Sequence, residues 1–117
     1  KLSGVSLSDN LYRFSRGGTD NRITYIGNKK RFFRATGTVS FQADASGVTY
    51  IFYIAKNGVV INKSKVYIKA NSTSDLLAIP LNVLTEMSPN DYLEVFAERF
   101  TSGTGTVTIA TLNLFVF

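Results

Sequence analysis

The amino-acid sequence predicts an all-β fold, either a sandwich or a barrel. Apolar stretches of strand length recur along the 117 residues, and turn-forming Gly, Pro, Asn and Asp residues separate them. Residues 33–42 alternate between apolar and polar side chains, which is the period of a strand with one buried face. No segment has a convincing helical period, so we expect strands to form nearly all of the fold.

The expected strands follow one another along the chain, after a polar segment (1–10) that we interpret as a linker or peripheral strand. Asn57-Gly58 is a strong hairpin signal, because both central residues of a type I′ turn need positive φ. Pro80 indicates an edge strand or a bulge, and residues 81–87 could form at most one helical turn. The expected strands are 11–14, 22–26, 33–42, 48–55, 59–70, 76–84, 92–100 and 106–117.

Length and composition predict one domain, residues 1–117, without membrane insertion. Charged residues make up 18% of the chain, below the typical ~25%, and no apolar run reaches the ~18 residues of a membrane span. The net charge of +5 favours acidic partners, although it also serves solubility. Because residue 1 is Lys, we expect an upstream region of the same protein.

The last expected strand carries a surplus of apolar side chains. Five of its final six residues, 112–117, are Leu, Phe or Val. Burying one such side chain fully is worth about 1.5–3 kcal/mol. We therefore expect a central strand that is buried on both faces, with one face in the core and the other against another copy of the chain.

Several segments occur in an order that resembles a known family. A Gly-containing alternating strand (36–41, TGTVSF) precedes an aliphatic strand that ends in KNGV (56–59). NDYLEV (90–95), a Gly-rich turn and a terminal aromatic strand follow. Together, residues 23–117 resemble the jelly-roll head shared by tumour necrosis factor and the globular complement heads. The likeness is closest to the heads at the C-terminal tips of phage tail fibres and spikes.

The resemblance implies a two-sheet jelly-roll sandwich of about 8–10 antiparallel strands that forms a homotrimer around an inner sheet. The inner sheet would contain residues 33–41, 92–100 and 106–117. By alternation, Leu93, Val95, Leu112 and Leu114 should enter the core. The residues that we expect at the trimer interface are Arg34, Tyr92, Glu94, Phe96, Glu98, Asn113, Phe115 and Phe117.

Two of the expected interface residues are acidic, and a carboxylate that is buried there needs a partner. Arg34, on the polar side of its strand, is our candidate partner for Glu94 and Glu98. In the alternative arrangement, both Glu residues are exposed to solvent on a monomeric sandwich.

The function implied by the resemblance is non-enzymatic. The chain would be a virion protein, extracellular on the phage tail, that trimerises and binds a saccharide receptor on the host surface. Loops at 16–21, 28–31, 71–74 and 101–104 are candidates for that contact. The candidate ligand-binding residues are basic, which suits phosphorylated or carboxylated saccharides: Arg16, Arg22, Lys29, Lys30 and Arg31. The alternative is a monomeric carbohydrate-binding module of a secreted enzyme.

Catalytic and metal-binding patterns are largely missing. Without His or Cys, the chain lacks imidazole acid–base chemistry and thiolate ligands. Glu94 and Glu98 lie about 13 Å apart along a strand, whereas glycosidase carboxyls lie ~5–9.5 Å apart. Pairing with a carboxylate elsewhere in the sequence stays open. No calcium-binding or phosphate-binding loop motif is present, so we expect no metal and no cofactor.

Nucleic-acid binding is a further alternative. Basic residues between Arg13 and Arg31 are interleaved with Tyr12, Phe14, Tyr25 and Phe32, and single-strand binders combine cations with stacking rings. However, an oligonucleotide-binding barrel has five strands, and these rings fit buried positions of alternating strands. We therefore rank this alternative below a saccharide.

Overall fold

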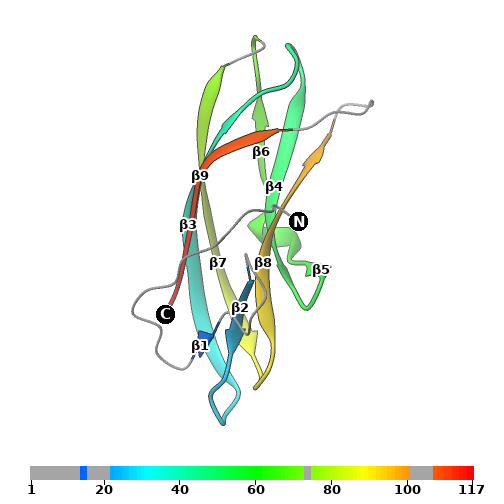
Figure 1. Cartoon of the computed structure of the whole chain (residues 1–117). Coiled ribbons are helices and arrows are strands. Elements are labelled where there is room, and N and C mark those ends of the chain that lie inside the picture. The colour runs from blue at the N-terminus through cyan, green and yellow to red at the C-terminus, as the bar shows by residue number, and fades with distance from the viewer. Residues whose placement is uncertain (1–13, 16–21, 73–74, 101–106) are drawn as a thin grey trace.

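The computed structural model describes residues 14–15, 22–72, 75–100 and 107–117, and it confirms the predicted all-β fold (Figure 1). The expected segment 1–10 and strand residues 11–13 lie outside the described residues. The elements are β1 (Phe14–Ser15), β2 (Arg22–Tyr25), β3 (Arg31–Gln42), β4 (Thr49–Lys56), β5 (Val59–Val60), the 3₁₀ turn η1 (Asn62–Ser64), β6 (Val66–Lys69), β7 (Leu76–Met87), β8 (Tyr92–Arg99) and β9 (Thr108–Val116).

These strands form two antiparallel sheets. The large sheet has the order β1-β2-β8-β4-β5, with β6 also paired to β4, and the small sheet has the order β7-β3-β9. The two sheets enclose one hydrophobic core, to which both contribute alternate residues of their strands. Val39 and Phe41 of β3, for example, lie in the same buried cluster as Phe52 of β4 and Leu93 of β8.

The sequence analysis predicted that the last strand is central, and this prediction is wrong. The strand lies at the edge of the small sheet. Within the described residues, β9 pairs with β3 alone. Its alternation follows the expectation, since Leu112, Leu114 and Val116 pack against the core while Phe115 and Phe117 are exposed. Apolar residues on both faces of a strand therefore indicated two contact surfaces, but did not indicate two neighbouring strands.

The predicted composition of the inner sheet is also wrong for one strand. β8 lies between β2 and β4 in the large sheet, whereas β3 and β9 belong to the small sheet. Alternation along β8 is nevertheless as expected, because Leu93 and Val95 enter the core. Alternation shows which residues share a face of a strand, but it carries no information about which strands are neighbours.

Two expected segments have different local structures. Residues 59–70 do not form one strand, because η1 interrupts them: the buried Ser64 hydroxyl accepts a hydrogen bond from Ile54 N–H at 2.8 Å and donates one to Ile61 O at 2.7 Å. β7 extends to Met87, beyond the expected strand end at residue 84, so residues 81–87 form no helical turn. Two local predictions are confirmed, namely the edge position of Pro80 and the positive φ of Asn57 (54°) and Gly58 (80°).

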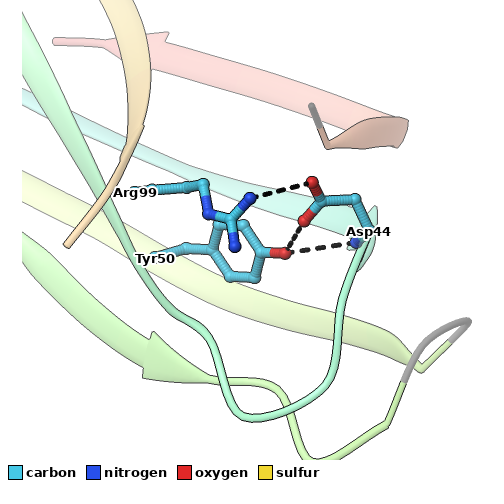
Figure 2. Close-up of polar contacts among 3 residues, drawn as sticks. All are labelled: Asp44, Tyr50 and Arg99. Atoms are coloured by element: carbon cyan, nitrogen blue, oxygen red, sulfur yellow. Dashed lines mark hydrogen bonds and ion pairs between the residues drawn. The ribbon is translucent and has the colours of Figure 1, made fainter. Parts of the chain in front are cut away.

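A polar clamp fixes the end of the sandwich where β3 leads into β4 (Figure 2). The Tyr50 hydroxyl donates to Asp44 Oδ1 and accepts from the Asp44 N–H at 3.1 Å. Arg99 Nη1 of β8 lies 3.4 Å from Asp44 Oδ2. Burial, and then the hydrogen bond to Asp44, raise the pKa of Tyr50 above 10.0. Because Tyr50 is buried, we interpret the clamp as structural.

Tyr50→Phe should lower the free energy of unfolding at pH 7 by about 1–3 kcal/mol, because a buried hydrogen bond to a carboxylate is lost. The raised pKa means that the neutral phenol stabilises the fold below pH 10, and that this contribution falls as the pH rises through the folded-state pKa. The difference from wild type should therefore narrow in denaturant titrations above pH ~10. Tyr67→Phe, at an exposed ring, is the control; equal stability of both variants at pH 7 would contradict the clamp.

Gly37→Ala should weaken the pairing of β3 with β9. A Cβ atom on Gly37 would lie 2.1 Å from the backbone carbonyl oxygen of Asn113, so one of the two strands must move. We expect a loss of about 1–3 kcal/mol in urea unfolding, as for other overpacked sites. Thr38→Ala, at the adjacent exposed position, should cost much less. A Gly37→Ala protein as stable as wild type would show that β9 does not have this register.

Candidate functional site

The expected trimer-interface residues fall into two groups on opposite sides of the sandwich. Arg34 of β3 and the three residues Asn113, Phe115 and Phe117 lie on the small sheet, on the face turned away from the core. Tyr92, Glu94, Phe96 and Glu98 lie on β8, on the outward face of the large sheet. The structure therefore does not gather all eight residues on one surface.

The outward face of the small sheet, which we call the small-sheet outer face, contains few charges. On β3 and β7, its charged side chains are those of Arg34 and Glu86. The outward side chains of residues 113, 115 and 117 are uncharged. The remaining outward residues of β3 and β7 are Phe32, Thr36, Thr38, Ser40, Gln42, Leu76, Ala78, Pro80, Asn82 and Leu84. Such depletion of charge is typical of the centre of a protein–protein interface.

Large apolar side chains gather at one end of this face. Phe32, Leu84, Phe115 and Phe117 are 67%, 55%, 62% and 66% exposed. They are close in register: Leu84 lies opposite Arg34, the backbone of Phe117 forms two hydrogen bonds with Arg34, and Phe115 lies opposite Thr36. We call these four side chains the apolar patch. They surround Arg34, and Glu86 lies opposite Phe32. Exposed apolar side chains gathered in this way are a common feature of interaction sites.

Three of the four outward residues of β8, namely Tyr92, Glu94 and Phe96, have partners within the protein. Glu94 is only 5% exposed, and its Oε2 lies 3.2 Å from Arg22 Nε. The Arg22 guanidinium also lies 3.8 Å from the centroid of the Tyr92 ring. Arg34 is therefore not the partner that Glu94 needs, because it lies on the other sheet. Phe96 stacks on Tyr53 at a centroid distance of 5.5 Å.

The basic residues that were predicted to bind a ligand are gathered only in part. Lys29 and Lys30 lie between β2 and β3, and Arg31 is the first residue of β3; we call residues 26–31 the basic turn. Arg22 is not part of it, because it is paired with Glu94 on the large sheet. Arg16 lies outside the described residues, as do the candidate loops 16–21 and 101–104 and part of 71–74.

The basic turn borders an open cavity of about 500 Å³, lined by Tyr25, Ile26, Gly27, Asn28, Lys29 and Arg31. Lys29 and Arg31 are exposed and form no ion pair with other described residues. Lys30 Nζ lies 3.8 Å from Glu86 Oε1 on the surface, where such a pair contributes little. The cavity thus combines two available cations with the amide of Asn28, which suits an anion that also carries hydroxyl groups.

Buried groups hold the basic turn in place. Tyr25, which is fully buried, donates from its hydroxyl to Lys29 O at 2.6 Å. Its backbone binds the turn between β7 and β8: Asn90 N–H donates to Tyr25 O at 2.7 Å, and Tyr25 N–H donates to Asp91 O at 2.8 Å. A Cβ atom at position 27 would lie 2.3 Å from the Tyr25 hydroxyl oxygen, so Gly27 leaves the space that this contact needs.

Asp91 connects this end of the sandwich to the Asn57-Gly58 hairpin. Its carboxylate accepts hydrogen bonds from Asn57 Nδ2 at 2.9 Å and from Ser88 N–H at 2.8 Å. Burial alone would raise the pKa of Asp91. The two hydrogen bonds, together with the positive charges of Lys56 and Lys30, outweigh burial and lower the pKa below 3.8.

Sequence reasoning missed a smaller cavity of about 270 Å³ at the β7 edge, lined by Arg34, Lys63, Asn82, Val83 and Leu84. No local signal connects Lys63 with Arg34, because η1 reaches β7 only through the tertiary fold.

Among the described residues, no acidic cluster could hold a metal ion. The same residues include no helix with the length and apolar character of a membrane span.

Comparisons with known proteins add no assignment: no family model matches the sequence, and no curated protein or solved structure matches it significantly.

Asp91→Asn should destabilise the protein by about 1–3 kcal/mol at pH 7. An amide has one acceptor oxygen, so it can accept only one of the two hydrogen bonds, and its NH₂ group would then point at the other donor. Because the pKa of Asp91 is lowered in the folded protein, its ionised carboxylate stabilises the fold above pH ~4. This contribution disappears as the pH falls through the folded-state pKa. The difference between variant and wild type in urea unfolding should therefore shrink below pH ~4. Glu98→Gln, at an exposed carboxylate, is the control. A difference that stays constant down to pH ~2 would contradict the assignment.

Proposed function

We propose that this chain is a non-enzymatic, homotrimeric jelly-roll head of a phage tail fibre or spike, and that it binds a saccharide on the host surface. The observation that carries the proposal is the small-sheet outer face, which is poor in charge and ends in the apolar patch. A surface of this composition is better suited to a second copy of a protein than to water.

The connectivity of the strands supports the jelly-roll assignment. From β2 onward the chain alternates between the sheets, apart from β4, β5 and β6, which follow one another in the large sheet. The small sheet receives β3, β7 and β9, and the large sheet β2, β4–β6 and β8. The chain therefore crosses between the two layers repeatedly, as in a double-sheet jelly roll, and does not complete one sheet before starting the other.

The energetics of the apolar patch favour association. Its four side chains are each more than half exposed, so covering them in an interface is worth about 1 kcal/mol or more per side chain. In a trimer this gain recurs in every copy, against the entropic cost of association. Arg34 and Glu86 lie at the same end of the face with opposite charges, which permits an ion pair between copies. Tyr92, Glu94, Phe96 and Glu98 are not needed in this interface.

The test of the trimer is the solution mass by light scattering at micromolar concentration. Wild type should have the mass of three chains. Phe115→Asp should dissociate the trimer, because it would bury an unpaired carboxylate. Val59→Asp, at an equally exposed apolar residue of the large sheet, is the matched control and should remain trimeric. Dissociation by Phe96→Asp but not by Phe115→Asp would instead move the interface to the large sheet.

A monomeric carbohydrate-binding module is the second candidate, and one observation favours it. Tyr67 and Phe100 are exposed beside each other on the large sheet, with ring centroids 5.5 Å apart. Exposed rings of this kind can stack against sugars. A wild-type monomer that binds a neutral polysaccharide, and loses this binding in Tyr67→Ala, would establish the second candidate in place of the first.

A further inference from the structure

We infer that the trimer carries three basic turns around one end of its axis, and that this ring binds a repeating polyanionic saccharide through several turns at once. The inference rests on the proposed trimer and adds the chemical class of the receptor, the residues that contact it and the reason why the trimer is needed.

The basic turn lies next to the apolar patch in the sequence and in the fold. Arg31 is both the last residue of the turn and the first residue of β3, and Phe32 of the apolar patch follows it directly. Leu84 and Phe117 lie beside Arg34, only a few residues further along the sheet. In Figure 1, the β2–β3 turn forms the lower tip of the molecule, beside the turn between β7 and β8. An interface formed through the apolar patch therefore brings the basic turns of all copies to the same end.

The end of the sandwich that contains the basic turn is positively charged. Lys29, Lys30 and Arg31, with Lys56 close by, outnumber the two carboxylates at this end of each copy. These carboxylates are Glu86, which lies beside Lys30, and Asp91, which accepts hydrogen bonds from Asn57 and Ser88. Converging turns of like charge repel one another unless an anion lies between them. A ligand with charges at regular intervals would relieve this repulsion, so its binding should also stabilise the trimer.

The shape of the site favours a saccharide over a nucleic acid. Binders of single-stranded nucleic acid stack bases on exposed rings, but Phe14 and Tyr25 are buried in the core. Phe32 is exposed, yet it belongs to the apolar patch and is covered in the proposed trimer. The cavity offers Ile26 and the amide of Asn28 beside its cations, which suits a sugar ring with hydroxyl groups and a phosphate or carboxylate.

Avidity explains the need for three copies. Exposed cations bind a single anion weakly, because water and salt screen them. Linking several such sites on one rigid particle can raise the apparent affinity about 10²–10⁴-fold for a polymer that spans them. The ring is therefore expected to discriminate a charged polymer from its monomer, and binding should weaken steeply as salt increases.

The experiment measures binding of the wild-type protein to four immobilised probes: phosphomannan, polygalacturonate, neutral dextran and a single-stranded oligothymidylate. Phosphomannan and polygalacturonate distinguish phosphate from carboxylate as the source of the charge. We expect wild type to bind one of them, not dextran, and more weakly at ~200 mM than at ~50 mM salt. Light scattering on the same samples reports the oligomeric state.

Two double variants with the same change in net charge test the basic turn. Lys29→Glu with Arg31→Glu should stay trimeric and lose binding at least about 100-fold. Lys65→Glu with Lys69→Glu, on and beside β6, should bind nearly as wild type. Phe115→Asp, with an intact turn but no trimer, should bind the polymer about 10²-fold or more weakly.

The outcomes separate this inference from the proposed function. A wild-type trimer whose binding is equal in the two double variants overturns the ring of basic turns but leaves the trimeric head intact. Tighter binding of oligothymidylate than of both acidic polysaccharides also overturns it, in favour of nucleic acid. A wild-type monomer overturns the proposed function, and the ring with it.

Discussion

The rest of the structure depends on the pairing of β3 with strands on both of its sides. β3 pairs along its whole length with β7, from Arg31 opposite Met87 to Gln42 opposite Leu76, and with β9 on the other side. Its alternation sends Ala35, Val39 and Phe41 into the core and the even-numbered residues between them outward. The absence of a side chain at Gly37 allows the β9 backbone to come close enough for this pairing.

This pairing separates the molecule into two surfaces with different properties. On the large sheet, Arg22 pairs with the buried Glu94 and covers the Tyr92 ring. The small sheet has few outward charges, but it exposes the apolar patch. Removing one member of a buried ion pair costs several kcal/mol, so the Arg22–Glu94 pair is best explained as part of the protomer itself. The small-sheet outer face differs in combining few charges with four exposed apolar side chains at one end.

The length of β3 also keeps the two ends of the sandwich apart. Twelve strand residues extend about 40 Å, and the Asp44–Tyr50–Arg99 clamp lies at the end opposite the basic turn. Both ends are stabilised by side-chain bonds to backbone groups, with a buried Tyr in each case. The basic turn differs in carrying available cations and a cavity. A rigid scaffold with a charged turn at one end is a common arrangement for binding.

Local chemistry accounts for what could be predicted without the structure. The all-β fold, the alternation in β3 and β8, the Asn57-Gly58 hairpin and the edge position of Pro80 all depend on neighbouring residues. The basic turn could be predicted as a candidate site because its three cations are consecutive. Arg22 could not be separated from them, since its role depends on Glu94, which is 72 residues away.

The sequence by itself therefore determined the type of each main element and which residues share a face, because backbone conformation and side-chain alternation are local properties. The tertiary structure alone decided that β8 joins the large sheet, that β9 lies at an edge and that Lys63 and Arg34 line the same cavity. It also placed the basic turn and the apolar patch at one end. These features depend on pairing between distant segments, where many registers and neighbours satisfy the same alternation until the whole core is packed.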